Sequence, residues 1–297
     1  MGRSLGLFGL SATALANLTA CCNVCKCSPK FKLGVLDWTW GGKYQQNPEA
    51  FEFAKKLGLD GLQVSSRFNP EKPSEFFTKE VMDGYKAKMS AYGLGVASTL
   101  ASGCSFLNTP NADLYIKAGI SATKELGSKS ILVSFFGPDR MSDANNVFDE
   151  KYFKPLVAQL KKVAGHAEKC GVNICMENTL TADENLRVIN AVGSPNVKVY
   201  FDTMNIEYYG HDAVSNIRKL KGQIGEIHLK NIAHKLDAKQ GSQPKDFEGS
   251  MQAIKEIGYE GWFVFELHDH NPAKDGSIES VISHNAAYTR NWIAKNF

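Results

Sequence analysis

Four potential metal ligands each end an apolar run in the second half of the chain. The runs and their terminal residues are 172–176 with Glu177, 197–201 with Asp202, 224–227 with His228, and 262–265 with Glu266. Short runs rich in β-branched and aromatic residues, without a helical period, are typical of buried parallel strands. Residues just past such strands lie at the carboxyl edge of a parallel sheet, where barrel enzymes carry their chemistry. Two Glu, one Asp and one His form a mostly oxygen-donor set, which predicts one divalent ion, with Mn²⁺, Mg²⁺ or Co²⁺ favoured over Zn²⁺.

The elements that must position these residues alternate along the whole chain. The other four expected strands span 31–38, 61–65, 94–100 and 130–136. The expected helices span 48–57, 75–92, 112–126, 149–170, 183–191, 212–220, 246–257 and 278–295. Eight strand–helix units without a linker predict an α/β fold, a single-domain (β/α)₈ TIM barrel over residues 31–297. A doubly wound open sheet is the alternative, and it is disfavoured because no Gly-x-Gly-x-x-Gly turn or phosphate loop follows a strand.

Length and composition agree with a globular α/β barrel. The chain has 297 residues, of which 43% are hydrophobic and 22% charged, and a barrel of this kind takes about 250 residues. The net charge of +3 is small and no basic stripe accompanies it, so we expect no nucleic-acid partner. After the N-terminal segment no run of 18 apolar residues appears that could span a membrane.

The N-terminal segment resembles a bacterial lipoprotein signal. Arg3 precedes a Leu/Ala/Gly-rich run over 5–18, and Leu18-Thr19-Ala20-Cys21 follows. This resemblance predicts a signal peptide over 1–20, a lipid on Cys21 and a tether over 21–30. The protein would then be a periplasmic or outer-membrane lipoprotein that meets the membrane only through its anchor. The alternative is a disordered or helical extension on a cytoplasmic enzyme.

Apart from Cys21, the other six of the seven cysteines fall into two groups. Cys22, Cys25 and Cys27 could form a metal or redox cluster, but their place outside any expected element favours a plain tether. Three others show no spacing that pairs them, and we expect core or loop thiols there: Cys104, Cys170 and Cys175.

The residues around the four ligands resemble the xylose isomerase-like (β/α)₈ superfamily, which includes sugar-phosphate isomerases and epimerases, the D-tagatose 3-epimerase group and endonuclease IV. The matching motifs are Met176-Glu177-Asn178, Phe201-Asp202-Thr203-Met204-Asn205, Ile227-His228-Leu229-Lys230 and Phe265-Glu266-Leu267. The resemblance covers about residues 31–297 and is specific in the second half. It implies that Glu177, Asp202, His228 and Glu266 hold one divalent metal, with the two Glu also acting as acid and base.

This division of labour suits proton transfer next to a carbonyl. Removing that proton creates an enediolate, whose negative charge needs a cation nearby. Inversion of configuration needs a base on each side of the carbon, and two carboxylates on opposite barrel walls can supply them. The expected function is therefore a metal-dependent isomerase or epimerase of a free sugar or sugar derivative. Two alternatives are a lyase that cleaves 3-keto-glycosides by β-elimination and a sugar-binding surface lipoprotein without activity.

Five further residues are candidates for binding a small carbohydrate substrate. Trp38 and Trp40 could form a platform for a sugar ring or simply fill the barrel mouth. Polar contacts could come from Lys230, Asn205 and His268. The sequence leaves the oligomeric state open.

The chain also departs from the families that it resembles. The D-tagatose 3-epimerase group has a His after the strand-six Asp, where this chain has Met204 and Asn205. That group also has an Arg after the strand-seven His, where this chain offers Lys230 and His234. The sugar specificity of the group is therefore not carried over. Endonuclease IV needs additional His ligands, and the second and third expected strands end without them, which argues against a DNA-repair role.

Overall fold

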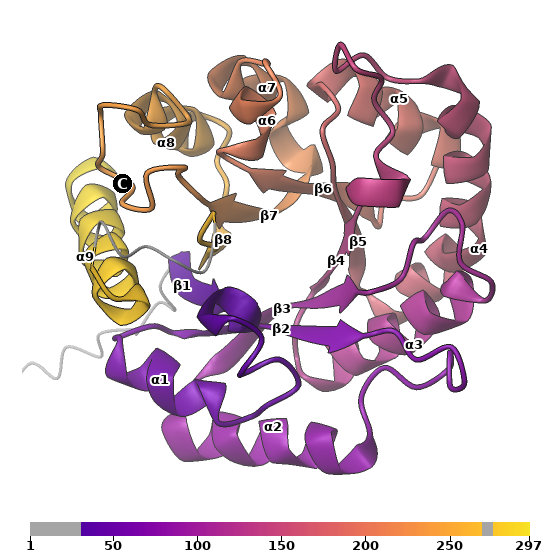
Figure 1. The fold of residues 1–297 in the computed structure, drawn as a ribbon, viewed down its shortest axis with the longest axis horizontal. Helices are drawn as coiled ribbons and strands as arrows, with labels where there is room; N and C mark the ends of the chain where they lie inside the picture. Colours follow the sequence, from indigo (N-terminus) through magenta and orange to yellow (C-terminus); the bar gives the residue numbers. More distant parts are fainter. Residues whose placement is uncertain (1–30, 269–275) are drawn as a thin grey trace, which may run out of the picture. The chain divides into compact units, whose positions relative to one another are not determined.

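Eight parallel strands close into a barrel in which each strand pairs with the next along the chain, and β1 pairs with β8 (Figure 1). The computed structural model describes residues 31–268 and 276–297. The strands are β1 (Phe31–Leu36), β2 (Gly61–Arg67), β3 (Gly95–Ser102), β4 (Ser130–Ser134), β5 (Asn173–Glu177), β6 (Val197–Asp202), β7 (Ile224–Leu229) and β8 (Gly261–Phe265). This arrangement confirms the predicted (β/α)₈ TIM barrel.

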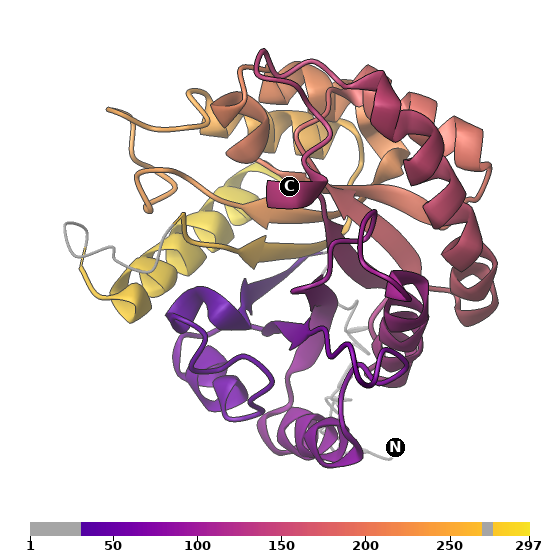
Figure 2. The ribbon, with the colours of Figure 1, turned by 45° about the vertical axis from the view of Figure 1, so that its right-hand side comes forward.

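The helices surround the strands (Figure 1 and Figure 2). The α-helices are α1 (Ala50–Lys56), α2 (Lys79–Tyr92), α3 (Ala112–Glu125), α4 (Phe153–Cys170), α5 (Ala182–Val192), α6 (Asn205–Tyr208), α7 (Ala213–Leu220), α8 (Phe247–Glu256) and α9 (Ile278–Asn296). The described residues also form short 3₁₀ turns, which are η1 (Asp37–Trp40), η2 (Gly137–Asp139), η3 (Glu150–Tyr152) and η4 (Lys221–Gln223). Within the described ranges, none of these helices combines the length and the apolarity that crossing a bilayer requires.

Local signals set many of the helix ends. Thr181 and Glu184 form a reciprocal capping box that starts α5. Gly171 ends α4 with a φ of 67°, a left-handed conformation that glycine adopts at low cost. The expected helix over 75–92 begins instead at Lys79, because the hydroxyl of Thr78 caps it by accepting the N–H of Val81 at 3.3 Å.

Two differences near strand ends affect the site. β1 stops at Leu36, two residues before the expected end, because Asp37–Trp40 turns into η1. A short helix that the sequence did not predict, α6, follows β6 directly. The carboxylate oxygen Oδ1 of Asp202 accepts the N–H groups of Met204 at 2.8 Å and Asn205 at 2.7 Å. The predicted metal ligand therefore also caps this first turn.

Two apolar clusters stabilise the barrel. The larger lies between strands and helices, and includes the buried face of α4. The smaller consists of Leu36, Ala97, Leu100, Leu132, Cys175, Tyr200 and Val264, with Trp38 and Trp262 packed against it. Near Trp262 the strands approach closely, since a Cβ atom at Gly61 would lie 2.1 Å from the carbonyl oxygen of Gly95.

The cysteines in the described residues carry free thiols, as expected for Cys104, Cys170 and Cys175. The predicted signal peptide (1–20), the tether (21–30) and their cysteines lie outside the described residues.

Asp37, which follows β1, is a buried carboxyl that does not belong to the group of four ligands. It is 1% exposed, and its Oδ2 accepts the N–H of Ser65 at 2.9 Å. Burial raises the pKa of Asp37 from 3.8 to about 7, although the hydrogen bonds from Ser65 oppose the rise. The group is therefore held partly in its neutral form by the fold.

We expect Asp37→Asn to remove a destabilisation that grows with pH. Between pH 3.8 and about 7, the folded chain keeps a proton that the unfolded chain has lost, so stability falls as the pH rises through this window. The free energy of unfolding of the variant, relative to wild type, should therefore rise by about 2 to 3 kcal/mol from pH 5 to pH 8. Urea unfolding at both pH values measures this change, and an equal difference at the two values would contradict it.

Candidate metal centre and active site

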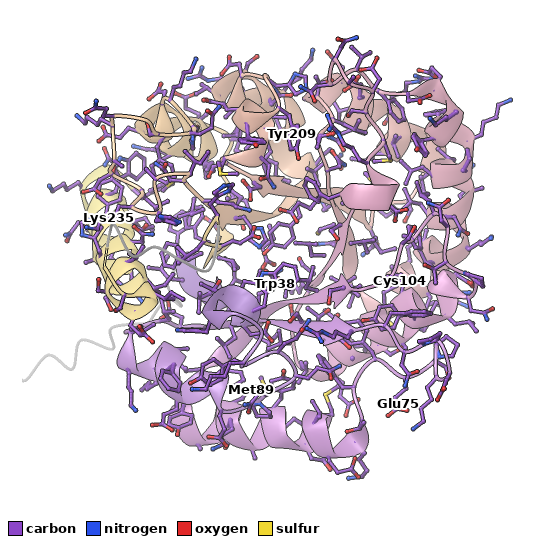
Figure 3. The ribbon with its side chains drawn as sticks, viewed as in Figure 1. Trp38, Glu75, Met89, Cys104, Tyr209 and Lys235 are labelled. Carbon is purple, nitrogen blue, oxygen red and sulfur yellow. The ribbon has the colours of Figure 1, made fainter. Side chains whose placement is uncertain are left out.

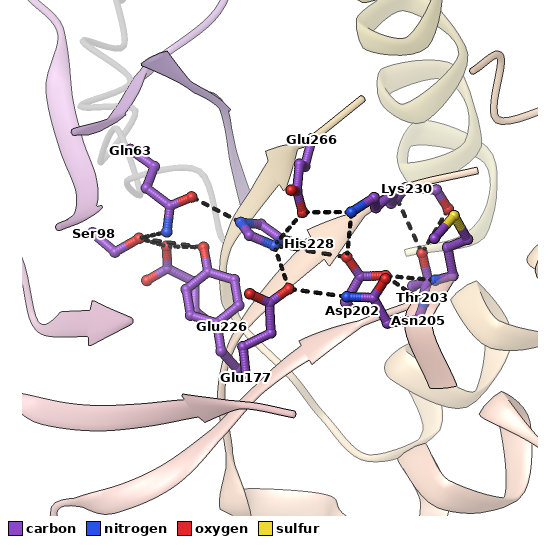
Figure 4. Close-up of polar contacts among 12 residues, drawn as sticks. Gln63, Ser98, Glu177, Asp202, Thr203, Asn205, Glu226, His228, Lys230 and Glu266 are labelled. Atoms are coloured by element: carbon purple, nitrogen blue, oxygen red, sulfur yellow. Dashed lines mark hydrogen bonds and ion pairs between the residues drawn. The ribbon is translucent and has the colours of Figure 1, made fainter. Parts of the chain in front are cut away.

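The four ligand-type residues meet at the carboxyl end of the barrel. Glu177 ends β5, Asp202 ends β6, His228 lies in β7, and Glu266 directly follows β8. Asp202 and His228 are register partners across β6 and β7, which places them at one level of the sheet. One ligand atom from each of the four lies within 4.8 Å of the others. Residues up to 89 positions apart in the sequence thus form one group (Figure 4).

The imidazole of His228 is the centre of this group. Its Nδ1 lies 3.1 Å from Oε2 of Glu266 and 3.2 Å from Oε1 of Glu177. Oδ2 of Asp202 is 3.8 Å away. On the other side of the ring, Nε2 lies 2.8 Å from Oε1 of Gln63. Because a carbonyl oxygen only accepts, Nε2 carries the proton and Nδ1 faces the carboxylates, as in a metal-bound His whose second nitrogen donates to the protein.

Lys230 is a second cation beside the carboxylates. Its buried ammonium lies 3.0 Å from Oε2 of Glu266 and 3.8 Å from Oδ2 of Asp202. For Glu266, burial is outweighed by Lys230 and His228, which hold its pKa well below the usual range. For Asp202, burial dominates and raises its pKa to about 7, although Lys230 opposes the rise. For His228, burial opposes protonation, but Glu266 and Glu177 outweigh it and raise the pKa to about 10.

These properties fit a divalent cation. Three carboxylates and the ammonium of Lys230 leave two negative charges in excess, which a divalent ion would balance. Oδ2 of Asp202 is buried and has no hydrogen-bond partner, and a buried polar atom without a partner is costly. A cation bound among the four residues would supply the missing partner. The raised pKa values of Asp202 and His228 describe the same excess of negative charge, which protons neutralise when no metal does so.

A cavity of about 410 Å³ opens onto the ligand group. Its lining includes Glu177, His228, Glu266, Lys230, Asn205 and the aromatic residues Trp38, Phe136, Tyr208, Tyr209 and His268. Trp38 lies near the middle of the ring of helices, and Tyr209 lies toward α6 (Figure 3). The amide of Asn205 donates to Oε1 of Glu177 at 3.2 Å.

Four of the five residues that the sequence proposes for substrate binding line this cavity, namely Trp38, Asn205, Lys230 and His268. Trp40 is placed differently. Its ring packs at 5.4 Å from that of Tyr44 and 6.2 Å from that of Phe53, against the outer core. Trp38 and Trp40 are two residues apart in the 3₁₀ turn η1. The turn therefore directs Trp38 to the cavity and Trp40 to the outer core.

Sequence reasoning missed several residues of the site. Gln63 and Glu226 are buried polar residues inside β2 and β7, and Tyr208 and Tyr209 arrive with the unpredicted α6. Glu226 stands two residues before His228 on one strand, so the two share a face. That period of two was a usable signal, whereas nothing near Gln63 indicates contact with a His 165 positions away.

Comparisons with known proteins agree with this fold. A model of the family described as xylose isomerase-like TIM barrel matches residues 51–291. The inosose dehydratase of Geobacillus thermodenitrificans (strain NG80-2) is 26% identical over 296 residues, covering 85% of this chain and 94% of the relative. The D-psicose 3-epimerase of Ruminiclostridium cellulolyticum is 29% identical over 256 residues, covering 79% and 83%. A crystal structure of the IOLI protein with a binding zinc atom superposes with a TM-score of 0.68 at 18% identity, covering 90% and 99%.

We expect the purified protein to carry about one divalent ion per chain. His228→Ala or Asp202→Ala should lose it, because each removes a ligand atom from a group whose members lie within 4.8 Å of one another. Elemental analysis of dialysed protein measures the stoichiometry. His284→Ala is the control, since His284 pairs with Asp237 on the surface. A stoichiometric ion that survives both substitutions would place the metal site elsewhere.

Proposed function

Because this chain belongs to the xylose isomerase-like TIM barrel family, we propose that it is a metal-dependent enzyme that moves a proton next to the carbonyl of a free sugar or sugar derivative. One observation carries the proposal. Two carboxylates, Glu177 and Glu266, reach one candidate metal centre from β5 and β8 and line the same cavity. Such a pair can remove a proton from a carbon and return one to it.

The metal would supply one part of this chemistry. A divalent ion held by Glu177, Asp202, His228 and Glu266 would provide the positive charge that an enediolate needs. The protein residues do the rest. Lys230 keeps Glu266 ionised at 3.0 Å, so this carboxylate is available as a proton acceptor. Asn205 holds the Glu177 carboxylate by one hydrogen bond at 3.2 Å.

The placement of the two carboxylates favours epimerisation. The carboxyl groups of Glu177, from β5, and Glu266, after β8, both reach Nδ1 of His228 (Figure 4). A substrate carbon between them could lose its proton to one carboxylate and receive a proton from the other. Because the two protons would be exchanged on opposite faces, the configuration at that carbon would invert. This is our leading interpretation, an isomerase or epimerase.

The cavity lining supports a small uncharged carbohydrate as substrate. Trp38, Phe136 and Tyr208 line the cavity, and aromatic rings suit the C–H face of a sugar ring, so we keep Trp38 as the proposed platform. Lys230 is the one lysine or arginine among the described lining residues, and its ammonium already pairs with Glu266. A phosphate ester would need additional cations, so a free sugar is favoured over a sugar phosphate.

A lyase is the second candidate. The relative from Geobacillus thermodenitrificans is an inosose dehydratase, and the same proton abstraction can expel a group from the β-carbon of a keto sugar. A 3-keto-glycoside would be a suitable substrate of such a β-elimination. In that reaction we propose that the buried ammonium of Lys230, 3.0 Å from Glu266, would interact with the leaving oxygen.

We expect Glu177→Gln and Glu266→Gln each to lower turnover at least about 10²-fold, because general acid–base catalysis contributes about 10² to 10⁴. The metal-loaded protein would be incubated in deuterated water with free ketoses and with 3-keto-glycosides. Mass spectrometry then measures deuterium uptake, and NMR identifies an epimer, an isomer or an elimination product. One of the two variants should still exchange substrate hydrogen with solvent without forming product, since each carboxylate serves one side of the carbon.

Glu71→Gln, an exposed change of the same type, serves as the control. Near-normal turnover in both variants would show that the two Glu are structural ligands only. Sugar binding without turnover or deuterium uptake in the wild-type protein would favour a non-catalytic sugar-binding protein instead.

We also propose that the protein is exported and lipid-modified on Cys21, on the basis of Leu18-Thr19-Ala20-Cys21. In a bacterial host, the wild-type protein should fractionate with membranes, and Cys21→Ser should block processing or release the protein. Cell fractionation and intact-mass measurement test this. A cytosolic wild-type protein that retains residues 1–20 would contradict the proposal.

A further inference from the structure

A chain of buried hydrogen bonds runs from His228 into the barrel (Figure 4). Nε2 of His228 lies 2.8 Å from Oε1 of Gln63. The amide Nε2 of Gln63 donates to the hydroxyl of Ser98 at 3.0 Å. Ser98 donates to Oε1 of Glu226 at 2.7 Å. The four side chains come from β7, β2 and β3, and each is at most 3% exposed.

Glu226, the acceptor at the end of this series of hydrogen bonds, determines which group donates and which accepts in each of them. Oε1 of Glu226 accepts the hydroxyls of Ser98 and, at 3.0 Å, of Tyr200. It remains an acceptor whether or not the other carboxyl oxygen carries a proton. The hydroxyl of Ser98 also lies 3.2 Å from that of Tyr200, but Tyr200 gives its proton to Glu226, and the shorter contact of Ser98 is the one to Glu226. With the Ser98 proton on Glu226, its oxygen accepts from Gln63.

The orientation of the Gln63 amide in turn determines which nitrogen of His228 carries the proton. Since the NH₂ group of Gln63 faces Ser98, its carbonyl oxygen must face His228. A carbonyl oxygen requires an N–H partner, so Nε2 of His228 keeps its proton. Nδ1, which faces Glu177 and Glu266, is then the nitrogen whose lone pair would be offered to a metal. If the Gln63 amide were turned the other way, its NH₂ group would face the Nε2–H of His228, and two hydrogen-bond donors would oppose each other.

Tyr200 adds a second link between the same residues. Its ring contacts the imidazole of His228 at a centroid distance of 4.4 Å, and its hydroxyl donates to Glu226. The carboxyl of Glu226 therefore anchors both the hydrogen-bond partner and the ring neighbour of the ligand.

We propose that Glu226 is a positioning residue that, through Ser98 and Gln63, fixes the tautomer and orientation in which His228 offers Nδ1 to the metal. The inference rests on the metal centre described above and does not require a particular substrate. Glu226 lies two residues from His228 on β7, yet its effect travels through two other strands. A side chain without an acceptor at position 226 would free Ser98 to turn its proton toward Gln63, and the amide would lose its fixed orientation.

The test compares variants by their affinity for Co²⁺. Ser98→Ala interrupts the series of hydrogen bonds between Gln63 and Glu226, and Glu226→Met removes the acceptor at the end of the series. Each should weaken Co²⁺ binding by about 10- to 100-fold, the usual cost of losing the partner of a metal-bound His. Glu226→Gln keeps one acceptor oxygen for Ser98 and should bind Co²⁺ nearly as wild type does. Ser250→Ala removes another buried hydroxyl, on α8, and controls for a general loss of stability.

A second readout reports on the imidazole itself. In the Co²⁺-loaded protein, the Nε2–H proton of His228 should give a paramagnetically shifted, exchangeable NMR signal that is protected by Gln63. Ser98→Ala and Glu226→Met should shift this signal or accelerate its exchange with solvent, whereas Glu226→Gln should not. A merely structural role of Glu226 would change the unfolding midpoint without moving this resonance.

A double variant makes the test specific. Glu at position 63 has only acceptor atoms when ionised, so Gln63→Glu would hold Nε2–H without help from Ser98. Adding Gln63→Glu to Glu226→Met should therefore restore Co²⁺ affinity while keeping the number of buried carboxyls unchanged. Folded double variants without restored affinity would overturn the proposal.

Wild-type Co²⁺ affinity and an unchanged Nε2–H signal in Ser98→Ala would also overturn it. If wild-type protein binds no Co²⁺, both the metal centre and this inference fail. If Co²⁺ binds but no sugar turns over, the proposed function fails while the positioning role of Glu226 stands.

Discussion

The excess of negative charge at the carboxyl end of the barrel is the constraint on which the site depends. Three carboxylates approach Nδ1 of His228. Among the described residues, Lys230 is the one lysine whose ammonium is paired with them, within 4 Å of two. In a buried environment such an excess must be balanced by protons or by a cation. The raised pKa values of Asp202 and His228 show the protons doing so. A divalent ion would replace them and turn the same residues into a rigid centre.

The barrel makes this concentration of charge possible. Parallel strands bring residues from β5, β6, β7 and β8 to one level through backbone hydrogen bonds, which do not depend on the charges themselves. Burial of the apolar layer between strands and helices therefore stabilises the barrel and offsets the electrostatic repulsion between the crowded carboxylates. Asp202 has two roles: its Oδ1 accepts the N–H of Asn205 at the start of α6, and its Oδ2 faces His228 and Lys230.

Beneath the ligands, the barrel interior is polar on one side. Gln63, Ser98 and Glu226 are buried polar residues that hydrogen bonds connect to one another and to His228. Polar groups are costly in a barrel core unless every donor finds an acceptor. Here each residue donates to the next, from His228 through Gln63 and Ser98 to Glu226. This order suits a role in orienting His228. The epimerase and lyase reactions that we propose both begin with removal of a proton next to a carbonyl, so either proposal needs the same arrangement of ligands.

The sequence by itself determined the fold class, the order of the elements and the grouping of the four ligand-type residues. These features depend on short-range signals: apolar runs, helix-ending glycines such as Gly171, and polar residues just past strands such as Glu177. Only the tertiary structure decided the rest. The four-residue α6 is too short to show a period and forms because Asp202 caps it. Trp38 and Trp40 differ only in which way η1 turns them. Gln63 meets His228 across 165 positions because the barrel closes, and no local pattern encodes a contact made by closure.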